Sequence, residues 1–165
     1  MRTSAKGATA LTLLPLLLCA VGIPPAPARA ETPAHSRGQV VYVPAYSHVY
    51  RGDREHRFFL TVTLSVRSTD PTLPLRIVDV EYRGSDGKPL RKFLKTSTSL
   101  GPFASTRYIV PESDVSGGSG ASFLVTWQSD RPVSPPLVDS VMIGTQGQQG
   151  VSFTSRGQVI KELSE

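Results

Sequence analysis

Cysteine and asparagine are almost missing from this chain of 165 residues. It has one cysteine, Cys19, and no asparagine. Cys19 lies in an N-terminal segment with the pattern of a removable signal peptide, so the rest of the chain offers neither disulfides nor a reactive thiolate. Without asparagine there is no N-x-S/T acceptor for glycosylation. A domain of this composition has to be stabilised by its hydrophobic core.

The first thirty residues carry that signal-peptide pattern. Arg2 and Lys6 precede a mainly apolar run at 8–21, and residues 28–30 match the A-x-A cleavage pattern. The run is shorter than the ~20 apolar residues that span a membrane as a helix. We therefore expect cleavage after Ala30, no transmembrane span in the mature chain, and export to the periplasm or the cell surface.

Two alternatives to this processing stay open. A retained signal anchor would need a longer apolar run. A lipoprotein would be anchored through Cys19, but a small residue precedes a lipidated cysteine and Leu18 is bulky. We expect the cleaved form without a lipid.

The net charge is smaller than the whole chain suggests. The chain has 18 Lys and Arg residues against 13 Asp and Glu residues. Residues 1–30 contain three of the basic residues and no acid, so the mature chain carries 15 − 13 = +2. A charge this small gives no support to nucleic-acid binding.

Alternation of apolar and polar residues is the main structural signal. In 58–68 the residues Phe58, Leu60, Val62, Leu64 and Val66 occupy one face, and Ser and Thr residues dominate the other. This period of two is typical of a half-buried strand in an antiparallel sheet.

The same alternation occurs in two other segments. In 121–128 it directs Phe123, Val125 and Trp127 toward the core, and Trp127, the only tryptophan, is its expected centre. In 76–82 it directs Val78, Val80 and Tyr82 inward. The other expected strands are 40–43, 90–94, 106–110, 137–143 and 151–154, with a short edge strand or a helical turn at 159–160.

Turn and loop signals separate these segments. The pair Asp86-Gly87 predicts a hairpin, because both residues tolerate positive φ. The charged connection 51–57 is expected to be an exposed loop, and the prolines of 132–136 exclude that segment from a ladder. The glycine-rich segments 117–120 and 144–150 are expected to be flexible loops.

Seven to nine short strands, spaced roughly ten to fifteen residues apart and without helical periodicity, predict an all-β chain. The expected fold is a single antiparallel β-sandwich of immunoglobulin-like architecture, with a small β-barrel as the alternative. The predicted organisation is a signal peptide (1–30), a disordered lead-in (31–38), the sandwich domain (39–161) and a tail (162–165).

Motifs of known chemistry are absent from the sequence. It has no CxxC, no HExxH, no Walker A loop and no dinucleotide fingerprint. Ser119 stands in a glycine-rich stretch that lacks the second glycine of a G-x-S-x-G elbow, so it is interpreted as a turn residue. We therefore expect neither an enzyme nor a resident cofactor.

One cluster of metal-ligating residue types occurs near the start of the expected domain. His48, Asp53, Glu55 and His56 could converge on a metal ion if their loop folds back on itself. Three arginines are interleaved with them and would pair with the acids and repel a cation. The simpler interpretation is a solvated charged loop.

A second polar cluster surrounds the last expected hairpin. The loop 144–150 is uncharged, long and rich in glycine and glutamine, which is typical of recognition rather than of a minimal turn. Arg156 could add a charge-assisted contact to a carboxylate or phosphate. Clustering with Tyr46 and His48 beside a pocket would support a ligand site. The candidate ligand-binding residues are therefore Gln148, Gln149, Arg156, Tyr46 and His48.

Several segments are distinctive in combination: 43–50 (VPAYSHVY), 64–70 (LSVRSTD), 117–127 (GGSGASFLVTW), 141–144 (VMIG) and 148–157 (QQGVSFTSRG). This combination resembles the bacterial domain of unknown function 3124 family over about residues 40–160. The resemblance implies an exported bacterial single-domain protein, lipid-anchored in some members, with no assigned activity and no catalytic residues to carry over.

The expected function is that of a non-enzymatic binding or accessory module of the periplasm or cell surface. This expectation follows from the architecture, which is common among such modules. The partner would be an unknown protein or a polar ligand of the cell envelope. The alternative is a periplasmic metal-binding protein that uses His48 and His56.

Overall fold

A computed structural model describes residues 35–163 of the chain. Cys19 and the predicted signal peptide, 1–30, lie outside the described residues. Within 35–163 there are strands and no helix, so the all-β prediction is confirmed, and no helix that could span a membrane occurs there. The strands are β1 (Ser36–Pro44), β2 (His48–Arg51), β3 (His56–Phe59), β4 (Thr61–Arg67), β5 (Leu75–Arg83), β6 (Pro89–Lys92), β7 (Thr98–Leu100), β8 (Ser105–Val110), β9 (Ser122–Val133), β10 (Leu137–Gln146), β11 (Gln149–Arg156) and β12 (Gln158–Glu162).

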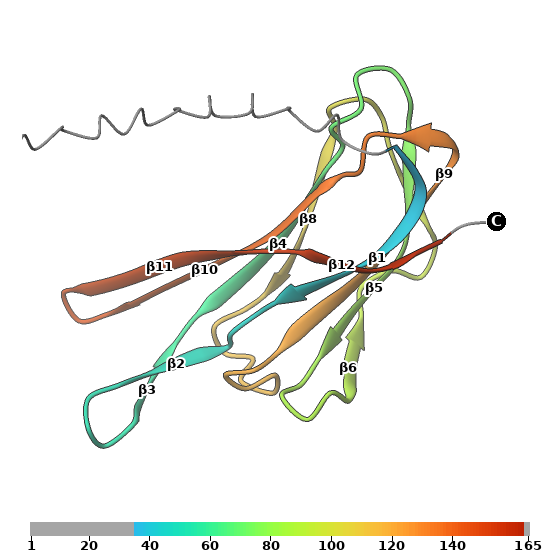
Figure 1. The fold of residues 1–165 in the computed structure, drawn as a ribbon. Coiled ribbons are helices and arrows are strands. Elements are labelled where there is room, and N and C mark those ends of the chain that lie inside the picture. Colours follow the sequence, from blue (N-terminus) through green and yellow to red (C-terminus); the bar gives the residue numbers. More distant parts are fainter. Residues whose placement is uncertain (1–34, 164–165) are drawn as a thin grey trace, which may run out of the picture. The chain divides into compact units, whose positions relative to one another are not determined.

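The strands of residues 35–163 form two larger antiparallel sheets and a separate hairpin (Figure 1). The six-stranded sheet has the order β12-β1-β9-β5-β6, and β7 also pairs with β5. The four-stranded sheet has the order β11-β10-β4-β8, and β2 pairs with β3. Neither larger sheet closes on itself in the described part of the chain. The prediction of an antiparallel β-sandwich, rather than a barrel, is confirmed.

The two sheets share a hydrophobic core centred on β9. Phe123, Val125 and Trp127 are all 0 % exposed, while Thr126 on the other face is half-buried. The facing sheet contributes the alternating residues of β4 and β10. Period-two patterning therefore predicted which side of these strands is buried. The facing core residues include Val62, Leu64, Val66, Val138 and Met142.

A bulge in β5 makes the predicted orientation of one side chain, that of Val78, wrong. Val78 was expected in the core but is 40 % exposed, whereas Ile77 is 0 % exposed. The register with β9 shifts between Ile77 and Asp79, so two successive residues of β5 oppose one position of the partner strand. Alternation resumes after the bulge with Val80 and Tyr82, which are buried as predicted.

The strand expected at 58–68 is divided at Leu60. β3 ends at Phe59 and β4 begins at Thr61, while the Leu60 N–H donates to the carbonyl of Ser47 at 3.0 Å. All five predicted inward residues are nevertheless buried. Alternation predicted the buried face correctly, but not the change of pairing partner.

Several predicted boundaries differ from the structure. Ser36 to Gly38 belong to β1, although a disordered lead-in was expected at 31–38, because β1 pairs with β9 as far as Ser36 opposite Val133. Pro132 lies inside β9. The register with β1 shifts there, between the pair Ser36–Val133 and the pair Gly38–Gln128. The prediction of a loop over 132–136 is therefore wrong at its start. β12 is an edge strand, not a helical turn, and it ends at Glu162.

The charged connection expected as an exposed loop at 51–57 is the turn end of a β-hairpin. β2 and β3 pair from His48 opposite Phe59 to Arg51 opposite His56. Positive φ angles at Gly52 (66°) and Glu55 (50°) form the turn. Residues 51–57 are exposed as expected, and 52–55 form the turn. The loop prediction is wrong at Arg51, His56 and Arg57, which belong to strands, because cross-strand backbone pairing leaves no composition signal in so charged a segment.

The connection expected as a long flexible loop at 144–150 is a tight hairpin. Thr145 pairs with Gly150, and Gln146 pairs with Gln149, which leaves a two-residue turn. Gly147 at the first turn position has a φ of 63°. Glycine with positive φ at that position is typical of a type II′ turn, whose twist matches that of the strands. The loop prediction is wrong here.

The glycine-rich segment before β9 is held by hydrogen bonds. The Ser85 N–H and hydroxyl both donate to the carbonyl of Gly117 at 2.9 Å, and the Gly120 N–H donates to Ser85 Oγ at 2.9 Å. A Cβ at Gly117 would lie 1.9 Å from the buried Tyr82 hydroxyl oxygen. Close packing requires glycine here, so the segment is not the flexible turn that composition suggested.

Candidate functional site

Three arginines gather on the outer face of the four-stranded sheet. Alternation along β4, β8 and β11 directs Arg67, Arg107 and Arg156 away from the core, and all three are exposed. Around them this face carries serine and threonine together with Val141, Ile109 and Ile143. We call Arg67, Arg107 and Arg156 the arginine cluster.

The ladder pairings fix the spacing of the arginine cluster. Arg156 is opposite Asp139 on β10, Asp139 is opposite Ser65 on β4, and Ser65 is opposite Arg107 on β8. Arg107 and Arg156 are therefore three strand spacings apart, or roughly 14 Å. Arg67 is diagonal to Arg107, at a distance of roughly 7–8 Å. The three guanidinium groups can contact one extended ligand.

The arginine cluster is not neutralised by the protein around it. Within 35–163 none of its members forms a hydrogen bond, an ion pair or a ring contact. Asp139 lies in the same row, but its Oδ1 is buried without a hydrogen-bond partner in the described chain. The formal charge of the three arginines with Asp139 is +3 − 1 = +2. This part of the sheet therefore presents a positive surface to solvent.

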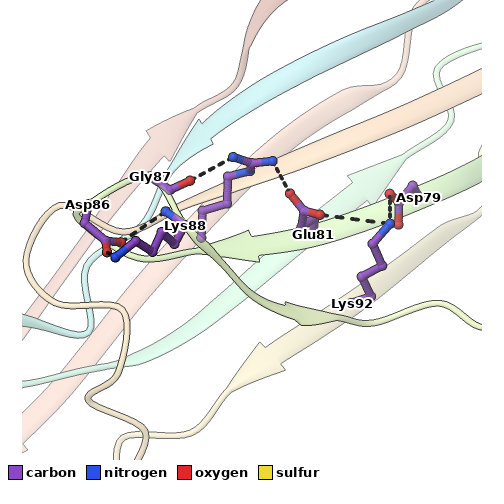
Figure 2. A network of polar contacts seen from close by, with 7 residues as sticks. Asp79, Glu81, Asp86, Gly87, Lys88 and Lys92 are labelled. Atoms are coloured by element: carbon purple, nitrogen blue, oxygen red, sulfur yellow. Dashed lines mark hydrogen bonds and ion pairs between the residues drawn. The ribbon is translucent and has the colours of Figure 1, made fainter.

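The charges on the other side of the sandwich are arranged differently. Lys92 Nζ lies 3.1 Å from Asp79 Oδ2, and the Arg83 guanidinium lies 2.5 Å from Glu81 Oε1 (Figure 2). These side chains lie on β5 and β6 of the six-stranded sheet. The four cations of β5 and β6 are paired with acids, whereas the cations of the four-stranded sheet form no ion pair within 35–163. Further pairs are Arg76–Asp130, Lys88–Asp86 and Arg91–Asp114.

A crevice lies beside one member of the arginine cluster. Its volume is about 450 Å³, and Arg156 and Gly157 line it where the chain passes from β11 to β12. Buried Val41 and Val138, from opposite sheets, contribute to its walls. The crevice therefore lies between the two sheets, at the side where β11 and β12 form their edges.

Asp70 holds another wall of this crevice in place. It is 3 % exposed, and its carboxylate accepts the N–H groups of Thr72 (2.9 Å), Leu73 (2.8 Å) and Ser134 (3.0 Å). Ser134 is one of the residues that line the crevice. These hydrogen bonds, that of Thr72 first, lower the pKa of Asp70 from 3.8 to about 2.

This lowered pKa predicts a dependence of stability on pH. A carboxyl group with a lower pKa in the folded state contributes stability above its unfolded pKa, and that contribution is lost as the pH falls through the folded pKa. Asp70→Asn should therefore lower the urea midpoint of unfolding at pH 7. The difference in midpoint between wild type and variant should become smaller between about pH 4 and pH 2. The exposed Asp53→Asn is the control. A difference in midpoint that stays constant down to pH 2 would contradict the stabilising role of the Asp70 carboxylate.

Comparison with known proteins yields a family assignment. The sequence profile described as "Protein of unknown function (DUF3124)" matches residues 38–160. The chain belongs to the DUF3124 family. The resemblance seen in the sequence is thereby confirmed. The match runs from β1 to β12 and includes the whole arginine cluster.

No curated protein matches this DUF3124 chain. One solved structure is similar, titled "Crystal Structure of Thermotoga maritima 1070". It shares 11 % sequence identity over 78 % of this chain and 98 % of the other, with a TM-score of 0.45. A similarity of this size carries no argument about function.

The predicted ligand-binding residues of this DUF3124 chain do not form one site. Gln148 and Gln149 lie at the turn of the β10–β11 hairpin, whereas Arg156 ends β11. Seven residues of extended chain, or roughly 24 Å, separate Gln149 from Arg156. Gln149 Oε1 instead accepts a hydrogen bond from Arg51 at 3.3 Å. Arg156 is grouped with Arg67 and Arg107.

Tyr46 and His48 are placed by packing. The Tyr46 ring lies edge-on to Phe153 of β11 with centroids 5.5 Å apart. Ser47 donates its hydroxyl to the carbonyl of Gly118, so His48 Nδ1 at 3.3 Å is the donor to Ser47 Oγ. Nε2 then accepts from the Tyr50 hydroxyl at 3.3 Å. Burial, and secondly Arg57, lowers the pKa of His48, which favours the neutral ring.

The four candidate metal ligands are not brought together. His48 pairs with Phe59, while His56 pairs with Arg51, so the two imidazoles point to opposite faces of the β2–β3 hairpin. Asp53 and Glu55 are exposed in the turn and, in the described chain, form no ion pair with the interleaved arginines. No group of three metal-ligating side chains occurs in residues 35–163.

Arg67 and Arg107 were not among the residues predicted from the sequence. Each stands on the polar face of an alternating strand, and that position alone is typical of any solvated sheet face. Their neighbourhood depends on β8 and β11 being placed on either side of β4 and β10. The sequence does show an arginine at a polar position of each strand. It does not show the strand order that brings these arginines onto one face.

Proposed function

We propose that the protein is a non-enzymatic binding module of the cell envelope, and that its arginine cluster binds a ligand carrying several negative charges. The single observation that supports this is the contrast with strands β5 and β6 of the other sheet. Acids pair with all four cations of β5 and β6, whereas Arg67, Arg107 and Arg156 have no polar partner within 35–163.

Arginine suits this role because its planar guanidinium donates paired hydrogen bonds to carboxylate, sulfate or phosphate oxygens. Like charges held close together on a surface also disfavour the unliganded state, though salt screens this at a Debye length of ≈ 8 Å. A ligand with several anionic groups would relieve the repulsion among the three cations. The exported location proposed for the chain would give it access to anionic polymers outside the cytoplasm.

The test uses heparin as a defined polyanion. Replacing all three arginines by glutamine should weaken binding roughly three- to hundredfold at 0.15 M salt, because exposed charged contacts are worth ~0.2–1 kcal/mol each. The matched control is Arg54→Gln/Arg57→Gln/Arg131→Gln. It removes the same charge from three other exposed positions.

Calorimetry would give both affinities, and thermal melts would show whether both variants remain folded. Equal losses in the two triple variants would mean that net charge, not the arginine cluster, determines binding. The proposal would then be wrong. The metal-binding alternative is not favoured, since the hairpin separates His48 from His56.

A further inference from the structure

The crevice between the sheets has the size and composition of a small-molecule site. Its volume of about 450 Å³ falls within the roughly 300–1,000 Å³ usual for ligand pockets. Val41 and Val138, which are 4 % and 3 % exposed, lie deep in it, and Val159, 44 % exposed, lies toward solvent. Proline and leucine side chains of the 134–138 segment complete an apolar wall.

The chain crossing at Gly157 gives the crevice a rigid end. The Gly157 N–H donates to the carbonyl of Val138 at 2.8 Å. A Cβ on Gly157 would lie 2.6 Å from Val41 Cγ1 and 2.9 Å from the Val138 oxygen. Backbone and valine side chains are therefore closely packed at this end of the crevice.

The polar groups of the crevice favour an anion. Among its described lining residues Arg156 is the only charged one, and it has no polar partner within 35–163. Gln39, 5 % exposed, donates from Nε2 to Glu162 Oε1 at 2.5 Å. The Glu162 carboxylate also accepts from Ser36 Oγ at 2.8 Å, so it is held by two donors on β1.

We infer that this crevice binds a small amphipathic monocarboxylate with an alkyl chain. The alkyl chain lies against Val41 and Val138, where it removes apolar surface from water. The carboxylate accepts hydrogen bonds from Arg156, the one charged residue that lines the crevice. A ligand without a negative charge would leave Arg156 unpaired, and one without an apolar chain would leave the valines in contact with water.

This site is distinct from the polyanion surface proposed above, although both use Arg156. Polyanion binding requires Arg67 and Arg107, which do not line the crevice. Carboxylate binding requires the apolar wall of the crevice, which lies between the sheets and not on the outer face. The failure of one proposal therefore leaves the other standing.

A chain-length series tests the inference. We would titrate the purified protein with butanoate, hexanoate and octanoate by calorimetry, and with octylamine as the probe of opposite charge. Affinity should rise about fourfold per added methylene, since each buried CH₂ contributes a constant increment. Octanoate should bind at least about tenfold more tightly than octylamine, because the Arg156 cation repels an ammonium group.

Two variants and two matched controls locate the site. Arg156→Gln should weaken octanoate binding up to about fivefold and abolish the preference over octylamine. Val159→Ser should weaken octanoate about fourfold and butanoate less. The control for Arg156 is Arg107→Gln, and the control for Val159 is Val78→Ser, at a valine with similar exposure. Both should leave the affinities for octanoate and butanoate unchanged.

Three outcomes would overturn the inference. One is equal affinity for butanoate and octanoate, or no binding of either at millimolar concentration. Another is an Arg156→Gln variant that keeps its melting temperature and binds octanoate as wild type does. The third is an equal loss of binding in Val78→Ser and Val159→Ser, which would place the alkyl chain outside the crevice.

Discussion

Replacing Trp127 by alanine is expected to lower the free energy of unfolding by ~3–5 kcal/mol. The side chain is 0 % exposed and is the largest of the fully buried ones in the described residues. Its indole Nε1 has no hydrogen-bond partner within 35–163, so the loss reflects apolar burial and the cavity left behind. Against a typical total of ~5–15 kcal/mol, this change could unfold the protein.

Urea titration of two further variants provides the controls. Thr126→Ala, on the opposite face of β9, should cost less than about 1 kcal/mol. Trp127→Phe should fall between the two, because it leaves a smaller cavity and removes the unpaired N–H. If Trp127→Ala and Thr126→Ala had equal midpoints, the assignment of the buried face of β9 would be refuted.

Gly144→Ala is expected to destabilise the fold by at least the ~1–3 kcal/mol usual for overpacking. A Cβ on Gly144 would lie 2.2 Å from the backbone oxygen of Phe59 and 2.9 Å from the Phe58 ring. Because the nearest atom belongs to the backbone, no rotamer change relieves the clash. Either β3 or β10 has to move.

Gly101→Ala is the matched control for this substitution. A Cβ on Gly101 would meet no described atom within 4 Å, and Gly101 does not have a positive φ. Its melting temperature should therefore stay at that of wild type or rise slightly, since alanine restricts the unfolded chain. Equal losses in Gly101→Ala and Gly144→Ala would show that close approach to Phe59 is not the reason for glycine at 144.

Alternation of side chains predicted the sandwich and the buried faces of β4 and β9, because burial of one face imposes a period of two. It failed at Val78, where a bulge adds a residue that composition does not reveal. It also failed in the two hairpins, where backbone pairing turned expected loops into strands. Register is a relation between two paired strands, so the sequence of one strand alone does not determine it.

The candidate site was predicted only in part. Arg156 was selected for its charge and for its place after the last long strand, and the structure puts it in the arginine cluster and at the crevice. Gln148 and Gln149 were selected for a loop that is a two-residue turn. Arg67 and Arg107 are far from Arg156 in the sequence, and only the order of strands in the sheet unites them.

The most direct test of the proposed recognition surface observes the arginine side chains themselves. Nuclear magnetic resonance can follow each guanidinium Nε–H signal while a short heparin oligosaccharide is titrated into the protein. The signals of Arg67, Arg107 and Arg156 should shift together and saturate at one affinity, while those of the ion-paired Arg76 and Arg83 stay in place. Shifts confined to other arginines, or spread equally over paired and unpaired ones, would contradict the account.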